Sequence, residues 1–167
     1  MRVYKTNADL TDTEWDKIES HHAFMKSNEY GPFFDALKKI IGGPASIVHY
    51  EIDPAGKLTT SLSAPVTECI TFHLQEKSSS FQSNLEEFAK VLEKGQGCLS
   101  AVGGWGVEDA EHEKLEGKGK SYLFTVGWQS IDAHMAFRDT QEFKDNIGKV
   151  RSEPKSVEMH HVKVESR

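Results

Sequence analysis

The sequence predicts an α+β protein, and three observations lead to that prediction. Residues 68–75 and 121–128 are short apolar segments rich in β-branched and aromatic side chains, which is typical of strands. Residues 83–94 instead place their apolar side chains at helical spacing. A segment that begins at Trp15 resembles one that begins at Trp128, which indicates that the chain holds two copies of one structural unit.

The elements of the C-terminal part can be placed from local residues. In chain order we expect a strand over 68–75, a helix over 83–94, strands over 99–105 and 121–128, a helix over 131–150 and a strand over 157–164. Ser83 or Asn84 can cap the first helix, and Gly95 and Gly97 end it. The charged, glycine-rich segment 108–120 reads as a loop or hairpin. The order strand, helix, strand, strand, helix, strand is that of a ferredoxin-like unit.

The N-terminal part reads as a shorter copy of this unit. Residues 15–30 align without a gap on residues 128–143, and the Trp, Ile, His, Ala, Phe and Glu positions match. A β-prone run follows each copy. The first copy supplies only a helix and its following strand, with one more strand possible around Val3. We therefore expect a partial repeat over residues 1–57 and a complete unit over residues 58–167.

Composition and charge exclude several classes of protein. Apolar residues make up 37% and charged residues 28% of the chain, which is ordinary for a globular protein. The net charge of −6 and the scattered lysines argue against nucleic acid and an anionic membrane surface as partners. No apolar stretch approaches the length of a membrane span, and no secretion signal opens the chain. We expect a cytoplasmic protein in which Cys69 and Cys98 are buried thiols.

Several segments resemble the antibiotic biosynthesis monooxygenase (ABM) family, and fungal proteins that carry the unit in tandem are the most similar. The resemblance rests on four segments and covers most of the chain: Glu29-Tyr-Gly-Pro-Phe-Phe, Ala64-Pro-Val-Thr-Glu-Cys-Ile-Thr-Phe, Gly127-Trp-Gln-Ser-Ile-Asp-Ala-His-Met-Ala-Phe-Arg-Asp-Thr and Met159-His-His-Val. Full tandem members are longer. The motifs are typical of the family and not of one activity, because members of this fold perform unrelated tasks.

The resemblance implies a dimeric α/β barrel, in which two four-stranded sheets pair, with a pocket between each sheet and its helices. In ABM-like enzymes this pocket takes aromatic, polyketide-like substrates, often without a metal or an organic cofactor. A buried base ionises a phenol or an activated carbon, and the anion reacts with oxygen. Relatives with the same architecture catalyse cyclisation or other proton transfers with one or two histidines.

Three histidines are the candidate catalytic residues, because imidazole transfers protons near neutral pH. His134 lies on the second expected helix, and His73 and His160 lie on the first and last expected strands. Each has a structural alternative: His134 can brace the helix against the sheet, and the other two can be surface or interface side chains. Neighbouring side chains of a strand alternate between faces, so only one of His160 and His161 can face the pocket.

Aromatic side chains are the candidate substrate-binding residues, because they can line a cavity for a flat molecule. They lie on the second and third strands and on the second helix: Trp105, Tyr122, Phe124, Trp128 and Phe137. The alternative is that they are ordinary core residues. We expect no metal site, because the histidines lack chelating spacing, and no nucleotide cofactor, because the glycines lack the order of a phosphate-binding loop.

Two functions remain open from the sequence. One is a small cofactor-independent enzyme, a monooxygenase, cyclase or related proton-transfer catalyst, that acts on an aromatic or polyketide-like metabolite. The other is a non-catalytic barrel protein that binds a small apolar ligand or has a stress-associated role. A sheet with helices on one face leaves its other face bare, so we expect a homodimer that covers it.

Overall fold

The structure, a computed structural model, describes residues 2–6, 13–39 and 45–162. The chain forms two compact units, residues 1–51 and residues 52–167. The boundary that the sequence suggested at residue 57 falls inside a helix of the second unit, α3 (Ala55–Leu62). Among the described residues, none of the helices is both long and apolar enough to span a membrane.

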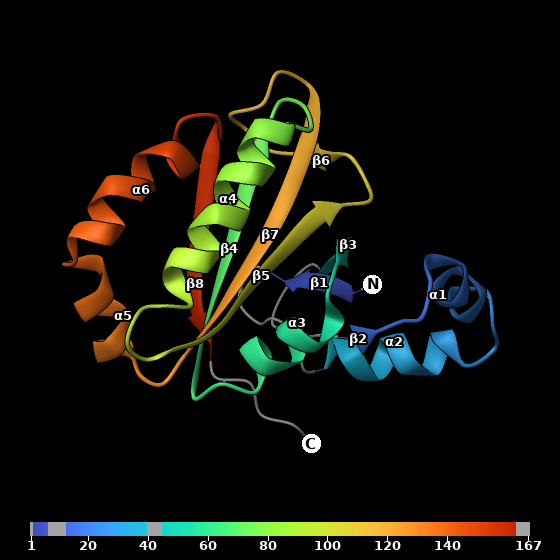
Figure 1. Ribbon diagram of the computed structural model, residues 1–167. Coiled ribbons are helices and arrows are strands. Elements are labelled where there is room, and N and C mark those ends of the chain that lie inside the picture. The colour runs from blue at the N-terminus through green and yellow to red at the C-terminus, as the bar shows by residue number, and fades with distance from the viewer. Residues whose placement is uncertain (1, 7–12, 40–44, 163–167) are drawn as a thin grey trace. The chain divides into compact units, whose positions relative to one another are not determined.

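The second unit is built on a four-stranded antiparallel sheet (Figure 1). In spatial order its strands are β5 (Cys98–Gly106), β7 (Lys118–Trp128), β4 (Val66–Leu74) and β8 (Ser156–Val162). The short strand β6 (Ala110–Glu111) pairs with the start of β7, so the charged segment between β5 and β7 is a hairpin. This strand order confirms the ferredoxin-like α+β fold. The pairing of two chains into a dimer stays a prediction.

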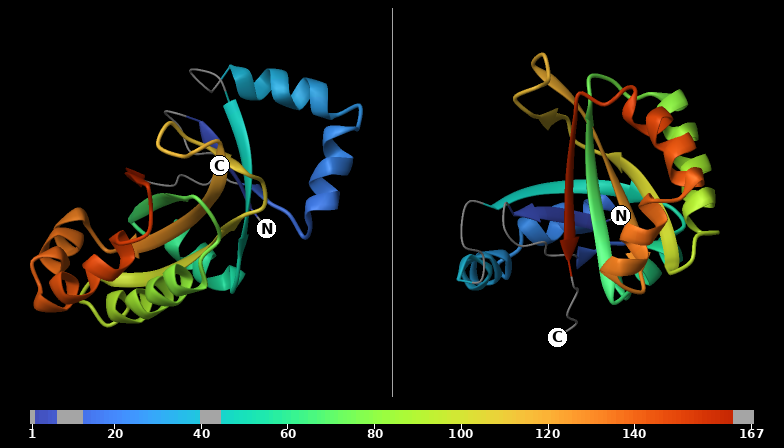
Figure 2. Two further views of the ribbon diagram at one scale, coloured as in Figure 1. Left: turned by 90° about the horizontal axis from the view of Figure 1, so that it is seen from above. Right: turned by 90° about the vertical axis from the view of Figure 1, so that its left-hand side faces the viewer.

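Three helices cover one face of this sheet: α4 (Ser79–Leu92), α5 (Ile131–Arg138) and α6 (Gln141–Arg151) (Figure 2). The prediction of one continuous helix over 131–150 was wrong. Thr140 interrupts it, because its Oγ1 accepts a hydrogen bond from the backbone N–H of Phe143 and caps a second helix. Helix α4 begins earlier than predicted, since Ser78 rather than Ser83 caps it by accepting from the Phe81 N–H.

Helix α3 was not predicted, because its sequence is poor in helix-forming residues. Its buried side chains, Leu58, Ser61 and Leu62, share one helical face. The side chain of Ser100 on β5 donates to the Lys57 carbonyl at 2.7 Å, and Thr67 on β4 donates to the Ser61 carbonyl at 2.7 Å. Contacts with the sheet therefore decide the conformation of this segment, against its local propensity.

The core of the second unit lies between the sheet and helices α4 to α6. Phe81 is fully buried on α4 and contacts Phe72 of β4 and Tyr122 of β7 at ring-centroid distances of 5.2 and 5.6 Å. Trp128, at the end of β7, is also fully buried. These aromatic contacts fix how the helices sit on the sheet, and they leave a cavity further along the same layer.

Within its described ranges, 2–6, 13–39 and 45–51, the first unit contains β1 (Arg2–Thr6), β2 (Thr13–Glu14), α1 (Ile18–Met25), α2 (Tyr30–Lys38) and β3 (Ala45–Ile52), which reaches the boundary between the units. β1 pairs antiparallel with β2 and with β3. The strand suggested around Val3 is therefore present as β1. The described residues do not include 7–10, which follow β1, or 163 and 164, which end the last expected strand.

Candidate active site

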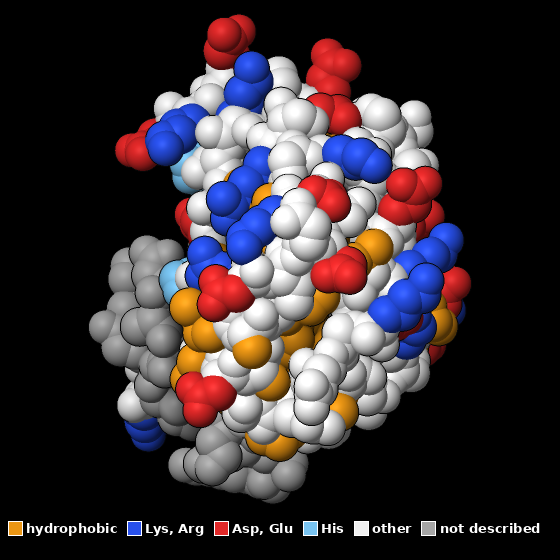
Figure 3. Space-filling view, turned by 60° about the vertical axis from the view of Figure 1, so that its left-hand side comes forward, with side chains coloured by type: hydrophobic (Ala, Val, Ile, Leu, Met, Phe, Trp, Pro, Cys, Tyr) orange, Lys and Arg blue, Asp and Glu red, His pale blue; other side chains and the backbone are white. Residues whose placement is uncertain are grey.

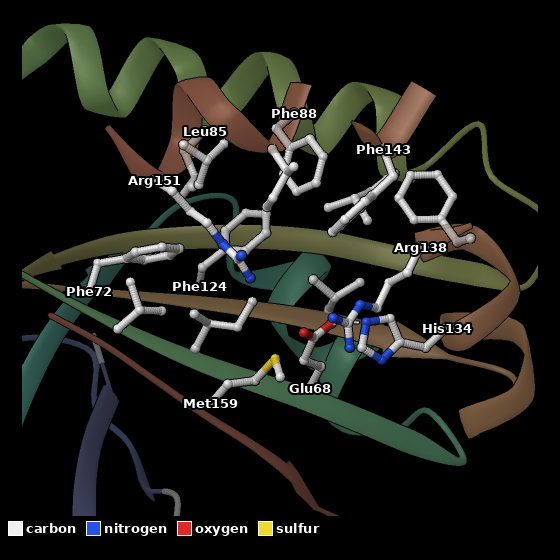
Figure 4. Close-up of a pocket in the computed structure, with 17 residues that line it drawn as sticks. Glu68, Phe72, Leu85, Phe88, Phe124, His134, Arg138, Phe143, Arg151 and Met159 are labelled. Atoms are coloured by element: carbon white, nitrogen blue, oxygen red, sulfur yellow. Dashed lines mark ion pairs between the residues drawn. The ribbon is translucent and has the colours of Figure 1, made fainter. Parts of the chain in front are cut away.

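A cavity of about 60 Å³ lies between the sheet and helices α4, α5 and α6 of the second unit. Most of its lining is apolar or aromatic, and Figure 3 shows hydrophobic side chains gathered around a hollow in the surface. The lining residues named in Figure 4 are Glu68, Phe72, Leu85, Phe88, Phe124, His134, Arg138, Phe143, Arg151 and Met159. A mainly apolar cavity with a few polar groups is the usual form of a small-molecule site.

Three of the charged or polar lining residues gather at one end of the cavity. Figure 4 shows Glu68, His134 and Arg138 turned toward one another there. His134 Nε2 lies 3.5 Å from Glu68 Oε2. Glu68 comes from β4 and is 4% exposed, while His134 comes from α5 and is 3% exposed. A buried carboxylate and a buried imidazole thus meet at one end of an apolar cavity.

Two further side chains hold this pair in place. The Trp128 indole Nε1–H donates to Glu68 Oε2 at 3.1 Å, and the indole stacks on the His134 ring at 5.0 Å. His134 Nδ1 lies 2.8 Å from His161 Nε2, so one ring donates a proton and the other accepts it. Because His161 is exposed on β8, these contacts link the buried carboxylate to the surface through two imidazoles.

Burial sets the charge of both groups. It lowers the pKa of His134 to about 4, and the nearby His161 and Arg138 act in the same direction. His134 is therefore neutral at pH 7 and can accept a proton at one nitrogen while donating from the other. Burial raises the pKa of Glu68, an effect that the Trp128 hydrogen bond and the positive charge of Arg138 oppose. A carboxylate with a raised pKa is a stronger base than one in water.

The pKa of His134 predicts how stability changes with pH. The unfolded chain binds a proton at this histidine near pH 6.5, whereas the folded chain does so only near pH 4. Stability from His134 is therefore present above pH 6.5 and is lost as pH falls toward 4, by up to about 3 kcal/mol. The contribution of Glu68 changes with pH in the opposite direction. Its raised pKa means that the folded chain binds the proton more readily than the unfolded chain, so lowering the pH favours folding at this residue.

We expect urea unfolding at pH 7, 6, 5 and 4 to show the wild type losing about 2–3 kcal/mol more than His134→Gln over this range. The matched variant His22→Gln replaces an exposed histidine of the first unit, and its profile should follow that of the wild type. Parallel profiles for the wild type and His134→Gln would contradict the lowered pKa.

Three of the residues singled out in the sequence line the cavity: His134, Phe124 and Phe137. Trp128 lies behind the lining, where it supports Glu68 and His134. Trp105 and Tyr122 lie apart from the cavity in the aromatic cluster around Phe81, and the Trp105 indole donates to Gln82 at 2.8 Å. The last two side chains therefore shape the core and do not line the cavity.

The two strand histidines chosen from the sequence lie away from the cavity. Ile70 and Phe72 of β4 line the cavity, and successive side chains of a strand point to opposite faces. His73 therefore lies on the other face of the sheet, where its ring stacks on His112 at 4.4 Å. His160 lies opposite Cys69 in the register and is exposed. The histidine of β8 that reaches the cavity side is its neighbour His161, which lies opposite Glu68.

Glu68, His161 and the cavity-facing role of Arg138 were not found from the sequence. Glu68 carried a usable signal: it shares a strand face with Ile70 and Phe72, so it is a charged residue on an apolar face. His161 carried none, because choosing it over His160 requires the register between β4 and β8. Arg138 precedes Asp139 in the sequence, and no local pattern marks its side chain as facing a cavity.

The first unit contains a similar arrangement of one tryptophan and two histidines. Trp15 stacks on His21 at 4.8 Å, and His21 Nδ1 lies 2.6 Å from His49 Nε2. The position opposite His49 in the register is Val3, where the second unit has Glu68 opposite its own histidine. The two histidines are 28 residues apart in the first unit and 27 apart in the second. An alignment of the two segments therefore needs a gap of one residue between the helix and the strand. This correspondence supports the proposed repeat.

Comparison with known proteins gives structural neighbours only. No family model matches the sequence, and no curated protein sequence matches it. An anthrone oxidase-like protein of known structure is similar over 96% of this chain and 76% of its own, with a TM-score of 0.64 and 15% identity. A candidate monooxygenase from Fusobacterium nucleatum is similar over 94% of this chain and 71% of its own, with a TM-score of 0.50 and 14% identity. SnoaB, a cofactor-independent oxygenase from Streptomyces nogalater, aligns over 61% of this chain and 94% of its own, with a TM-score of 0.46 and 14% identity. At these identities the similarity establishes the fold.

Proposed function

We propose that the chain is a small enzyme that removes a proton from a flat, apolar substrate and lets the resulting anion react with molecular oxygen. The observation that carries this proposal is the apolar cavity with Glu68, His134 and Arg138 together at one end. The structural likeness to an anthrone oxidase-like protein supports the same reading by analogy of fold. The substrate class that follows is an aromatic ketone or phenol of the polyketide type, and a homodimer in the cytoplasm is part of the proposal.

Glu68 is the proposed base. It takes a proton from a CH₂ group that is conjugated with a carbonyl through an aromatic ring, and Arg138 stabilises the negative charge that moves onto the carbonyl oxygen. The proton then leaves through His134 to His161, which exchanges it with solvent. The carbanion transfers electrons to O₂, so that a CH₂ group and O₂ become a C=O group and water. No metal or flavin is required by this balance.

The size of the cavity sets a condition on this proposal. Substrate pockets usually hold about 300–1,000 Å³, whereas this cavity has about 60 Å³. A three-ring substrate must therefore push lining side chains aside. The movable ones are at the rim, where Val157 and Met159 of β8 are 43% and 44% exposed and Arg151 of α6 is exposed. We expect a substrate to enter between β8 and α6.

Oxygen uptake with anthrone as the probe tests the proposed function. The purified chain, treated with EDTA and without added flavin, is expected to accelerate oxygen consumption above the buffer rate and to yield anthraquinone. Absence of acceleration with anthrone and with hydroxylated anthrones would contradict the proposal.

The narrow cavity favours a second candidate, a protein that binds a small apolar ligand without changing it. Trp128 lies beside the cavity, so its fluorescence reports occupancy. Quenching by anthrone with no oxygen uptake would support this candidate over the enzyme.

A further inference from the structure

A second group of ionisable side chains lies on the sheet face that points away from the cavity. It consists of His73 on β4, His112 in the hairpin between β6 and β7, and Glu158 on β8. His73 Nε2 and His112 Nε2 lie 3.8 and 3.6 Å from the same Glu158 oxygen, Oε1. One donor atom from each residue lies within 4.8 Å of the other two.

The sheet and the hairpin hold these three residues close together. Thr71 is opposite Glu158 and His73 is opposite Ser156, so the imidazole and the carboxylate are diagonal neighbours on one face. The hairpin that carries His112 is tied to the end of β4 by Gln75. Its side-chain amide donates to the Glu116 and Lys118 carbonyls at 3.0 and 3.2 Å and accepts from the Glu116 N–H at 3.0 Å.

We propose that His73, His112 and Glu158 bind one divalent transition-metal ion, with Zn²⁺ as the preferred ion. Two imidazoles and a carboxylate form a common set of zinc ligands. Soft ions are disfavoured because the group contains no thiolate, and Ca²⁺ and Mg²⁺ are disfavoured because two of the three ligand atoms are nitrogen. In a tetrahedral site with bonds of about 2.0–2.2 Å the donor atoms lie about 3.3–3.5 Å apart. The observed separations of 3.6 and 3.8 Å are close to that spacing and longer than hydrogen bonds.

The site is reachable from solvent. The side chains of His73, His112 and Glu158 are 9%, 15% and 32% exposed. A shallow depression lined by Glu111, His112, Glu113, Gly117 and Lys118 adjoins the group. A water molecule can therefore complete the coordination as the fourth ligand.

The group at the cavity has a different geometry. There the two imidazole nitrogens of His134 and His161 are only 2.8 Å apart and share a proton, and Trp128 donates to the carboxylate. A metal ion would have to break both contacts. At the new site His112 Nδ1 accepts from the Lys114 N–H at 3.1 Å, and metal binding at Nε2 would move the ring proton to Nδ1 and replace this exposed hydrogen bond.

No spacing in the sequence indicated this site, because its ligands come from two strands and a hairpin that are distant along the chain. The proposal is independent of the proposed activity, since it concerns the other face of the sheet and is measured by metal binding alone.

Zinc binding to the full-length, untagged chain tests the proposal. After EDTA treatment and dialysis, competition with a chromogenic chelator is expected to give one Zn²⁺ per chain, and Co²⁺ is expected to give the visible absorption of a four-coordinate site. His112→Ala and Glu158→Gln change partly exposed side chains, and each is expected to weaken binding by at least about 100-fold. Circular dichroism verifies that both variants are folded.

Two controls distinguish this site from other histidines. His160→Ala removes an exposed imidazole from the same strand, and His134→Ala disrupts the group at the cavity; both are expected to retain the Zn²⁺ affinity of the wild type. The proposal is overturned if the wild type binds less than one Zn²⁺ per chain, if binding survives in both His112→Ala and Glu158→Gln, or if it is lost in His134→Ala instead.

Discussion

Glu68→Gln is expected to reduce the catalytic rate with an anthrone probe by about 10²–10⁴-fold. Glutamine has nearly the shape of glutamate, and its side-chain oxygen can still accept the hydrogen bond from the Trp128 indole. It cannot accept a proton from the substrate. The loss should therefore appear in kcat, while probe binding followed by Trp128 fluorescence changes little.

Stability separates this effect from misfolding. Burial raises the pKa of Glu68, which means that the folded chain holds the ionised carboxylate at a cost. The amide removes that cost, so the free energy of unfolding of Glu68→Gln at pH 7 should equal or exceed that of the wild type. Glu87→Gln, on the exposed side of α4, is the control and should keep both activity and stability. Full activity in Glu68→Gln would exclude Glu68 as the base.

Phe81→Ala is expected to lower the free energy of unfolding by about 3–5 kcal/mol. Phe81 is 0% exposed and contacts Phe72, Trp105 and Tyr122, with ring centroids 5.2, 6.0 and 5.6 Å away. Alanine leaves a cavity in this aromatic cluster, which rigid strand residues surround on the sheet side and cannot fill.

Urea denaturation followed by far-ultraviolet circular dichroism measures this loss. Phe33→Ala removes the same side chain where it is 45% exposed on α2, and its expected cost is below about 1 kcal/mol. Equal losses in the two variants would show that the cluster around Phe81 does not stabilise the fold as described.

Local patterns were sufficient to predict the fold of the second unit, because strand alternation and helical spacing agree with the final contacts there. They failed where a single side chain or a distant contact decides the outcome. Thr140 breaks the helix of residues 131–150 through one hydrogen bond to the Phe143 N–H. Helix α3 forms because Leu58 and Leu62 find partners in the sheet, although the Ser and Thr residues around them disfavour a helix.

The candidate site was predicted in part for a related reason. His134 was a candidate because an imidazole on the second expected helix can transfer protons in a pocket between helix and sheet. Choosing between His160 and His161 requires the register of β8 against β4, which no local pattern reveals. Glu68 could have been noticed as a charged residue on an apolar strand face, but its contacts with Trp128 and His134 depend on the folded chain. The sequence predicted a lining of aromatic side chains. Of the five residues chosen for it, Phe124 and Phe137 line the cavity.

The two copies of the tryptophan–histidine–histidine arrangement provide the most direct test of the central claim, that the cavity of the second unit is the reaction site. His134→Ala and His21→Ala make the same change in similar surroundings, since each histidine stacks on a tryptophan and bonds to a second histidine. His134 also lies 3.5 Å from the Glu68 carboxylate and lines the cavity. In the oxygen-uptake assay we expect His134→Ala to lose at least about 100-fold in kcat, and His21→Ala to retain the wild-type rate while it is folded. Equal rates in the two variants, whether both active or both inactive, would contradict the claim and mark the arrangement as a structural brace shared by both units.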